Sequence, residues 1–314
     1  MRPSPDAATA LGLALGALAD LALADPRRGH PVAGFGRAAA ALERRTWRDS
    51  RAAGAGHWAV LVGSTTALGV AADRATRSRP VLRTAVTAAA TWAVLGGTSL
   101  GRVAVRMHDA LAAGDLPAAR ATLPALAGRD PQGLGEAELA RATVESVAEN
   151  TSDAAVAPLV WGAVAGLPGL LAYRAVNTLD AMVGHRSPRY ARFGWAAARA
   201  DDVANWLPAR STAALTAACA PLVGGSSAGA WRVWHRDGAA HPSPNSGRCE
   251  ASLAGALGLR LGGRNVYGSR VEERPALGDG RPPATADVPR AVALSRAVWA
   301  AAAAAAVLAR LLRR

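Results

Sequence analysis

The stretch AAVAPLVWGAVAGLPGLLAY, from Ala154 to Tyr173, decides the fold class of this chain. It contains no charged side chain, although Asp153 precedes it directly and Arg174 follows it. A helix needs close to 20 consecutive apolar residues to cross a bilayer, because a charged side chain in hydrocarbon is costly. The stretch therefore predicts a membrane-spanning helix.

Further uncharged windows lie on both sides of this stretch. Two weaker ones near the termini are interrupted by Asp20 and Arg310, whose positions near the window ends allow the charges to snorkel to the surface. Together the windows cover residues 7–24, 52–72, 84–101, 154–173, 211–231 and 297–312. We expect an all-α, polytopic membrane helix bundle, with one integral-membrane domain over residues 1–314 and Arg-rich loops. Because the windows are rich in Ala rather than Leu, a soluble all-α protein with buried Ala-rich helices is the alternative.

The basic residues exclude several classes of function. All 36 are arginine, and the net charge is +13. Without lysine the chain cannot form a lysine Schiff base, which excludes pyridoxal-phosphate enzymes. It also cannot contain a P-loop of the Walker type. No nucleic-acid-binding motif accompanies the charge, so we expect no nucleic-acid partner. If all six windows cross, the loops 25–51, 102–153 and 232–296 share one side and hold 22 of the arginines, which predicts that side to be cytoplasmic.

An acidic run leads directly into the first window described above. Glu145, Glu149 and Asp153 follow one another at intervals of four residues, so they lie along one face of a helix. A solvated helix face is the ordinary explanation for such spacing. Here the run enters an uncharged window, where an acidic cluster is expensive and usually functional. We therefore predict a role in binding Mg²⁺ or substrate.

Two further polar clusters follow the window. Asn177 and Asp180 lie three residues apart on one helix, which Gly184 can end. Asp201 and Asn205 lie four residues apart on another. Asp and Asn pairs on two helices can offer oxygen ligands to Mg²⁺. The alternative is that Asp201 simply caps the following helix.

Two turns have the composition of anion-binding loops. The run HPSPNSGRCE, from His241 to Glu250, opens onto an Ala- and Leu-rich segment expected to be helical over 251–263, and its free N–H groups favour phosphate. Near the N-terminus, residues 25–37 contain a turn with Arg27 and Arg28, which can bind phosphate or carboxylate bidentately. That turn is equally suited to anchor the first span on the cytoplasmic side.

Five ordered motifs in these regions resemble the cobalamin biosynthesis family CobD/CbiB. They run in the family's order over nearly the whole chain and are DPRR…HPV…GR from Asp25, ESVAENTSD from Glu145, AVNTLDAM with GHR from Ala175, DDVANW from Asp201 and HPSPNSG from His241. The resemblance implies a multi-pass membrane protein that acts as adenosylcobinamide-phosphate synthase. Such an enzyme joins adenosylcobyric acid to aminopropanol phosphate, or a related amino alcohol phosphate, through an ATP-dependent amide bond. Arg248 and Cys249 stand where the family is expected to have Trp-Pro, which puts in doubt any specific role of these two positions.

The implied chemistry assigns roles to the polar residues. A carboxylate must be activated before an amine attacks it, typically as an acyl phosphate, and this requires ATP, Mg²⁺ and cations on the transferred group. The expected magnesium ligands are Glu145, Glu149, Asp153 and Asp201, with Asp180 able to share the ion. Residues expected to bind phosphate groups or substrate are Arg27, Arg28, Arg186, Asn177, Asn205, Asn245 and Gly247. His185 or Asp180 would accept the amine proton.

The resemblance also implies a location and partners. We expect a multi-pass protein of the bacterial cell membrane whose site faces the cytoplasm, where ATP and the corrinoid are found. Since simple alternation over six spans puts residues 174–210 on the other side, Pro158 and Pro168 offer a point where the intervening helix can break. Expected partners are the lipid bilayer and other membrane enzymes of late cobalamin assembly. Two other functions fit the same residues: a membrane Mg²⁺-dependent prenyl- or alcohol-phosphate transferase, and a non-enzymatic membrane signalling protein or transporter.

Overall fold

The computed structural model describes residues 4–26, 28–185, 187–267 and 270–313, and it confirms an all-α membrane helix bundle. Four of its helices are long and apolar enough to cross a membrane: Pro5–Leu23, Arg51–Thr76, Glu136–Gly184 and Asp287–Leu311.

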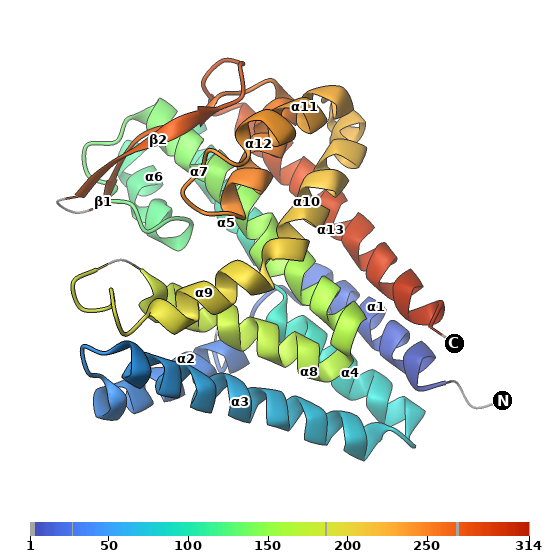
Figure 1. Cartoon of the computed structure of the whole chain (residues 1–314). Helices are drawn as coiled ribbons and strands as arrows, with labels where there is room; N and C mark the ends of the chain where they lie inside the picture. The colour runs from blue at the N-terminus through green and yellow to red at the C-terminus, as the bar shows by residue number, and fades with distance from the viewer. Residues whose placement is uncertain (1–3, 27, 186, 268–269, 314) are drawn as a thin grey trace. The chain divides into compact units, whose positions relative to one another are not determined.

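The elements follow one another as a series of helices with one late hairpin (Figure 1). The helices are α1 (Pro5–Leu23), α2 (Pro31–Thr46), α3 (Arg51–Thr76), α4 (Pro80–Val94), α5 (Gly97–Ala112), α6 (Leu116–Thr122), α7 (Glu136–Thr151), α8 (Ala157–Leu179), α9 (Trp195–Ala204), α10 (Trp206–Cys219), α11 (Ser227–Asp237), α12 (Ser246–Leu257) and α13 (Asp287–Leu311). The short helical turns are η1 (Leu123–Ala125), η2 (Ser152–Val156), η3 (Asp180–Gly184) and η4 (Ala220–Val223), of which η2 and η3 are π-helical. The strands are β1 (Leu261–Tyr267) and β2 (Arg270–Leu277).

Two of the six predicted spans are each divided between two separate helices, which corrects that expectation. The window 84–101 is divided between α4 and α5 at Leu95 and Gly96, and the window 211–231 is divided between α10 and α11. The two windows that looked weaker form the long helices α1 and α13. Asp20 and Arg310 are buried within the protein, so they do not snorkel as expected.

The helices form two compact units, each assembled from separate segments of the chain. The first contains Met1–Gly96, Ala157–Asn205 and Ala302–Arg314, and the second contains Gly97–Val156 and Trp206–Ala301. Because each unit combines distant segments, neither corresponds to a continuous stretch of sequence. The single domain over 1–314 stays a prediction.

Close helix packing and an apolar core hold the first unit together. Helices α1 and α4 lie side by side, and a Cβ atom added to Gly12 would lie 2.5 Å from the Thr87 Cβ atom. Small residues at such crossings let helices approach closely where lipid removes the hydrophobic driving force. Helices α2, α3, α8 and α9 share a core of Ala39, Leu61, Val62, Ala175, Val176, Leu179, Val183, Phe193 and Ala197.

Helix α8 contains the break that its prolines predict. The backbone leaves helical geometry at Gly166, where φ is +64°, two residues before Pro168. The break leaves carbonyl groups without helical partners, and the Arg310 guanidinium donates to the Gly162 carbonyl at 3.0 Å. Pro158 is the second residue of α8 and comes directly after the π-helical turn η2.

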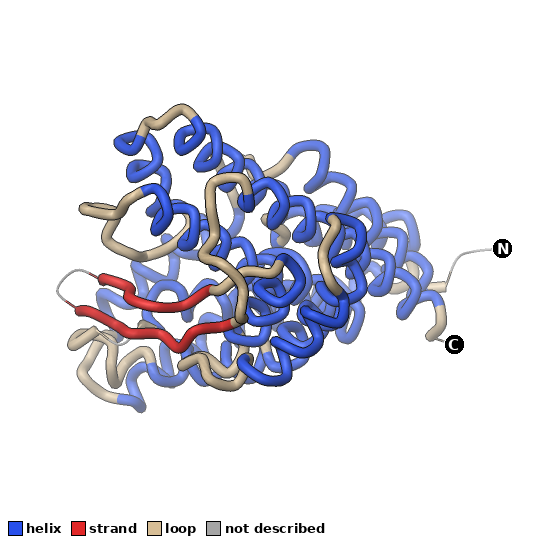
Figure 2. The backbone as a smooth tube through the Cα atoms, turned by 90° about the horizontal axis from the view of Figure 1, so that it is seen from above, coloured by secondary structure: helices blue, strands red, loops and turns tan. Residues whose placement is uncertain are grey.

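A two-stranded antiparallel hairpin in the second unit was not predicted (Figure 2). Helix α12 ends at Leu257 rather than near residue 263, because Gly258 adopts a left-handed conformation with φ +66°. The strands then pair Leu261 with Leu277, with an irregularity in register before Gly263. Helices α5 to α7 of this unit enclose a core of Met107, Leu111, Ala119, Leu123, Leu126, Leu139, Ala140 and Ala142.

Candidate functional site

Glu145, the first carboxylate of the acidic run on α7, has several polar partners. Glu145 is only 2% exposed and forms ion pairs with Arg129 and with Arg141, the latter at 3.4 Å. Its Oε1 atom also accepts a hydrogen bond from the Gly262 N–H at 2.8 Å. Arg141 in turn donates to the Asn265 Oδ1 atom at 3.1 Å, so the start of β1 is tied to α7.

The other two predicted ligands of this run are less buried. Glu149 accepts a hydrogen bond from the Ser246 hydroxyl at 2.7 Å, which connects α7 to the first residue of α12. Asp153 lies in the π-helical turn η2, where the regular four-residue repeat of α7 ends at Thr151. Glu145 and Glu149 therefore lie on the α-helix itself, and Asp153 lies in the π-helical turn that continues it.

The predicted phosphate loop forms a compact turn before α12. The His241 Nδ1 atom accepts a hydrogen bond from the Ser243 N–H at 3.0 Å, and the Asn245 Oδ1 atom accepts one from Arg210 at 3.5 Å. A Cβ atom on Gly247 would lie 2.4 Å from the His241 Cβ atom, so close packing explains the glycine. A substrate role of Asn245 and Gly247 stays a prediction.

Glu250 is a buried carboxyl group that the sequence reasoning did not select. It is 1% exposed, and neither of its oxygens has a hydrogen-bond partner among the described residues. The nearest cationic atoms are His241 Nε2 at 3.7 Å and Arg274 Nη1 at 3.9 Å. Burial raises the pKa of Glu250 well above its usual range, and the carboxylates of Glu145 and Glu149 raise it further. The signal available in the sequence was a single acid opening an otherwise Ala- and Leu-rich helix.

Two neighbours of Glu250 are also electrostatically perturbed. Burial, followed by the charge of Arg274, lowers the pKa of His241. Because its Nδ1 atom accepts from Ser243, the neutral ring carries its proton on Nε2, on the side of Glu250. Burial, followed by the charge of Asp153, raises the pKa of the Cys249 thiol well above its usual range, which makes this cysteine a poor nucleophile.

The first unit contains a separate chain of polar contacts at the ends of α8 and α9. The Asp201 carboxylate accepts hydrogen bonds from Asn205 at 3.0 Å and from Asn177 at 3.4 Å. The Asn205 Oδ1 atom accepts from the Tyr173 hydroxyl at 2.9 Å, and the Asn177 Oδ1 atom accepts from Arg174 at 3.3 Å. The structure thus brings together Asn177, Asp201 and Asn205, which the sequence placed in two clusters.

The remaining predicted residues of the first unit are less closely connected. Asp180 begins the turn η3, which ends at Gly184 as expected, and a Cβ atom on Gly184 would overlap the Asp180 carboxylate. His185 is exposed, and its ring lies edge-on to the Tyr190 ring at 4.9 Å between centroids.

The predicted arginines near phosphate are only partly described. Arg28 is exposed and follows Asp25, which contacts the His30 ring at 3.4 Å. Arg27 and Arg186 lie outside the described residues. Phosphate binding by these three arginines stays a prediction.

Comparison with known proteins gives the relationships of the chain. The family model described as CobD/Cbib protein matches residues 13–295. The chain belongs to the CobD/CbiB family. Three curated relatives named cobalamin biosynthesis protein CobD illustrate the similarity. That of Mycobacterium tuberculosis is 58% identical over 95% of this chain and 95% of the relative. The relative from Geobacter metallireducens is 47% identical over 83% of this chain and 84% of the relative. The relative from Chromobacterium violaceum is 43% identical over 93% of this chain and 94% of the relative.

Membership in the CobD/CbiB family supports a role in cobalamin biosynthesis. No solved structure matches the chain.

Some of the predicted magnesium ligands of this CobD/CbiB protein already have partners within the protein. Within the described ranges, no group of three or more His, Cys, Asp or Glu side chains is arranged to hold a metal ion. Glu145 already has two arginines and a backbone N–H as partners. Both oxygens of Asp201 accept hydrogen bonds from amides. The predicted magnesium ligands stay predictions.

Proposed function

We propose that this protein is an adenosylcobinamide-phosphate synthase. It would join the carboxylate of adenosylcobyric acid to the amine of aminopropanol phosphate or a related amino alcohol phosphate. In the first step the carboxylate attacks the γ-phosphorus of ATP, giving an acyl phosphate and ADP. In the second step the amine attacks the acyl carbon, and inorganic phosphate and a proton leave as the amide forms. Family membership over residues 13–295 is the observation that carries this proposal.

The two polar regions suggest a division of roles within the proposed reaction. His185 or Asp180 would take the proton from the amine, and Asn177 and Asn205 would contact substrate. In the second unit, Asn245 and Gly247 would contact substrate from their loop. Arg27, Arg28 and Arg186 would hold phosphate groups, since lysine is not available in this chain.

Magnesium would enter with ATP, because phosphate oxygens and a few carboxylates are its usual ligands. When bound, the ion would neutralise charge on the transferred phosphoryl group. Within the acidic run, Glu149 and Asp153 are half-buried whereas Glu145 is buried, so we assign the contact with such a complex to Glu149 and Asp153. We propose that the substrates reach these residues from the cytoplasmic side of the cell membrane, where other enzymes of late cobalamin assembly would supply them.

The direct test uses the full-length protein purified in detergent. It is mixed with adenosylcobyric acid, aminopropanol phosphate, ATP and Mg²⁺, and the amide product is sought by mass spectrometry. We expect product only when ATP is present. Glu149→Gln and Asp153→Asn should each reduce the rate by roughly 10- to 100-fold or more at normal protein abundance. The matched control is Asp49→Asn, which removes an exposed carboxylate elsewhere.

The same experiment separates the other functions. Product from a prenyl diphosphate and none from the corrinoid would favour a prenyl- or alcohol-phosphate transferase. A folded protein that consumes no ATP with any amino alcohol phosphate would contradict the ligase and favour a signalling or transport role. Equal loss of protein and activity in the two carboxylate variants would assign Glu149 and Asp153 to packing.

A further inference from the structure

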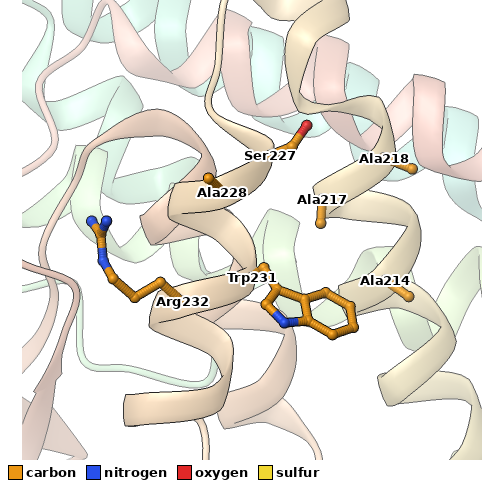
Figure 3. A pocket seen from close by; sticks show the side chains of 7 residues that line it. All are labelled: Ala214, Ala217, Ala218, Ser227, Ala228, Trp231 and Arg232. Carbon is orange, nitrogen blue, oxygen red and sulfur yellow. The ribbon is translucent and has the colours of Figure 1, made fainter.

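The uncharged segment from Ser211 to Trp231 folds back on itself. Arg210 and Arg232 bound it, and it comprises most of α10, the turn η4 and the start of α11. In Figure 3, Ala218 and Ser227 lie at the end near the turn, while Ala214 and Trp231 lie further from it, so the two helices run in opposite directions. The rise from residue 210 to residue 222 is about 18 Å at 1.5 Å per residue. That length enters a hydrocarbon core of about 30 Å without crossing it.

The outward face of this hairpin is mostly apolar, although Ser226 and Ser227 after the turn are also exposed. Leu222 at the turn is 75% exposed and Trp231 is 53% exposed. By contrast, Thr212 and Thr216 of α10 are buried. A helix that packs on a protein core and faces water shows the reverse pattern. The distribution therefore fits a surface that faces hydrocarbon.

The backbone at the turn is satisfied within the protein. The Gly224 N–H donates to the Pro221 carbonyl at 3.1 Å, and the Gly225 N–H donates to the Ala220 carbonyl at 2.9 Å. The Ser226 N–H donates to the Ala256 carbonyl of α12 at 2.8 Å. Inside a bilayer each such group needs an internal partner, because no water is available. These contacts meet that requirement at the point where the chain reverses.

A groove runs between α10 and α11, with a volume of about 530 Å³ (Figure 3). Its walls include the methyl groups of Ala214, Ala217 and Ala218, and the Trp231 indole lies between the two helices. Ser227 and Ala228 line the groove as well, so its surface is mostly hydrocarbon and suits an acyl chain. Arg232 also lines the groove, and its charged side chain can anchor lipid headgroups at the membrane surface.

We propose that the α10–α11 hairpin is a re-entrant membrane element. It enters one leaflet and returns to the same side, with Leu222 deepest, a lipid acyl chain in the groove, and Arg210 and Arg232 at the membrane surface. Trp206, which lies against the Arg210 guanidinium at 4.1 Å, and Trp231 occupy the interface, as aromatic residues of membrane proteins do. The segments before α10 and after α11 then lie on one side, in contrast to the crossing that the uncharged window predicts.

The first experiment measures depth. The full-length protein, with Cys219 and Cys249 replaced by alanine, carries Leu222→Cys labelled with the fluorophore NBD in vesicles of phosphatidylcholine and phosphatidylglycerol. We expect stronger quenching by nitroxides on the acyl chains than by aqueous iodide, and a second variant, Ala218→Cys, should behave in the same way. Ala113→Cys, in the exposed connection after α5, is the control that iodide should quench. Quenching of the Leu222 label by iodide would overturn the proposal.

The second experiment measures sidedness. Val203→Cys and Ala239→Cys, which replace exposed residues before and after the hairpin, are treated in sealed vesicles with a membrane-impermeant maleimide. Labelling of both from the same side is expected. Labelling from opposite sides would show that the segment crosses the bilayer and would overturn the re-entrant arrangement.

Discussion

Asp201 in the first unit and Glu145 in the second are carboxylates held by different kinds of partner. The amides of Asn177 and Asn205 both donate to the Asp201 carboxylate. In the second unit, Glu145 is compensated by two arginines. Glu250, in the same unit, has no hydrogen-bond donor among the described residues. Amide donors stabilise a carboxylate without introducing a second charge. In a buried ion pair, removal of one member leaves the other charge buried without compensation.

The buried ion pair gives the largest expected effect. Glu145→Ala leaves Arg129 buried without this carboxylate, and breaking such a pair destabilises a protein by about 3–5 kcal/mol. We expect a large fall in the thermal unfolding temperature of the detergent-purified protein, or loss of folded protein altogether. Asp49→Asn is the control. An unchanged unfolding temperature would remove the contrast between Glu145 and Asp201.

The amide network should be less sensitive to a single change. Asn205→Ala removes the acceptor of the Tyr173 hydroxyl and one donor to Asp201, which should cost about 1–3 kcal/mol. Tyr173→Phe, which removes only the first contact, should cost less. Thermal unfolding of both variants in the same detergent measures the difference, and a larger loss than for Glu145→Ala would reverse the comparison.

The contribution of Glu250 to stability should depend on pH. Its pKa is raised in the folded state, so its contribution to stability is complete below the unfolded-state value of about 4.3 and is lost as the pH rises through the folded-state value. Glu250→Gln cannot lose a proton and should change stability by less than about 1 kcal/mol at pH 5. The difference in unfolding temperature, variant minus natural protein, should therefore become more positive as the pH is raised from 5 to 8. A difference that is constant with pH would mean that Glu250 does not titrate abnormally.

An exposed ion pair should give the smallest effect. Asp49 and Arg192 approach to 3.5 Å with both side chains more than half exposed. Arg192→Gln should change stability by no more than about 0.5 kcal/mol, because water already solvates both charges. A loss comparable to that of Glu145→Ala would show that burial is not what separates strong from weak pairs here.

Parts of the candidate site followed from spacing alone. Asp201 and Asn205, four residues apart, do form a hydrogen bond, and η3 does end at Gly184. Spacing did not predict the π-helical turn that begins at Ser152 and contains Asp153. It also could not find the partners of Glu145, since the Gly262 N–H is 117 residues away in the chain.

Hydropathy and short motifs can be read from neighbouring residues. They were sufficient to predict the membrane helix bundle and the family. The free energy of transfer from water to the bilayer is a sum over neighbouring residues. The run 154–173 therefore indicates a membrane helix without reference to the rest of the chain. Tertiary structure decided which uncharged runs are single helices: α1 accommodates Asp20 by burying it, while the window 211–231 reverses at Gly224 and Gly225. It also decided that Glu250 is buried beside His241 and Arg274, because burial depends on which distant segments pack together rather than on composition.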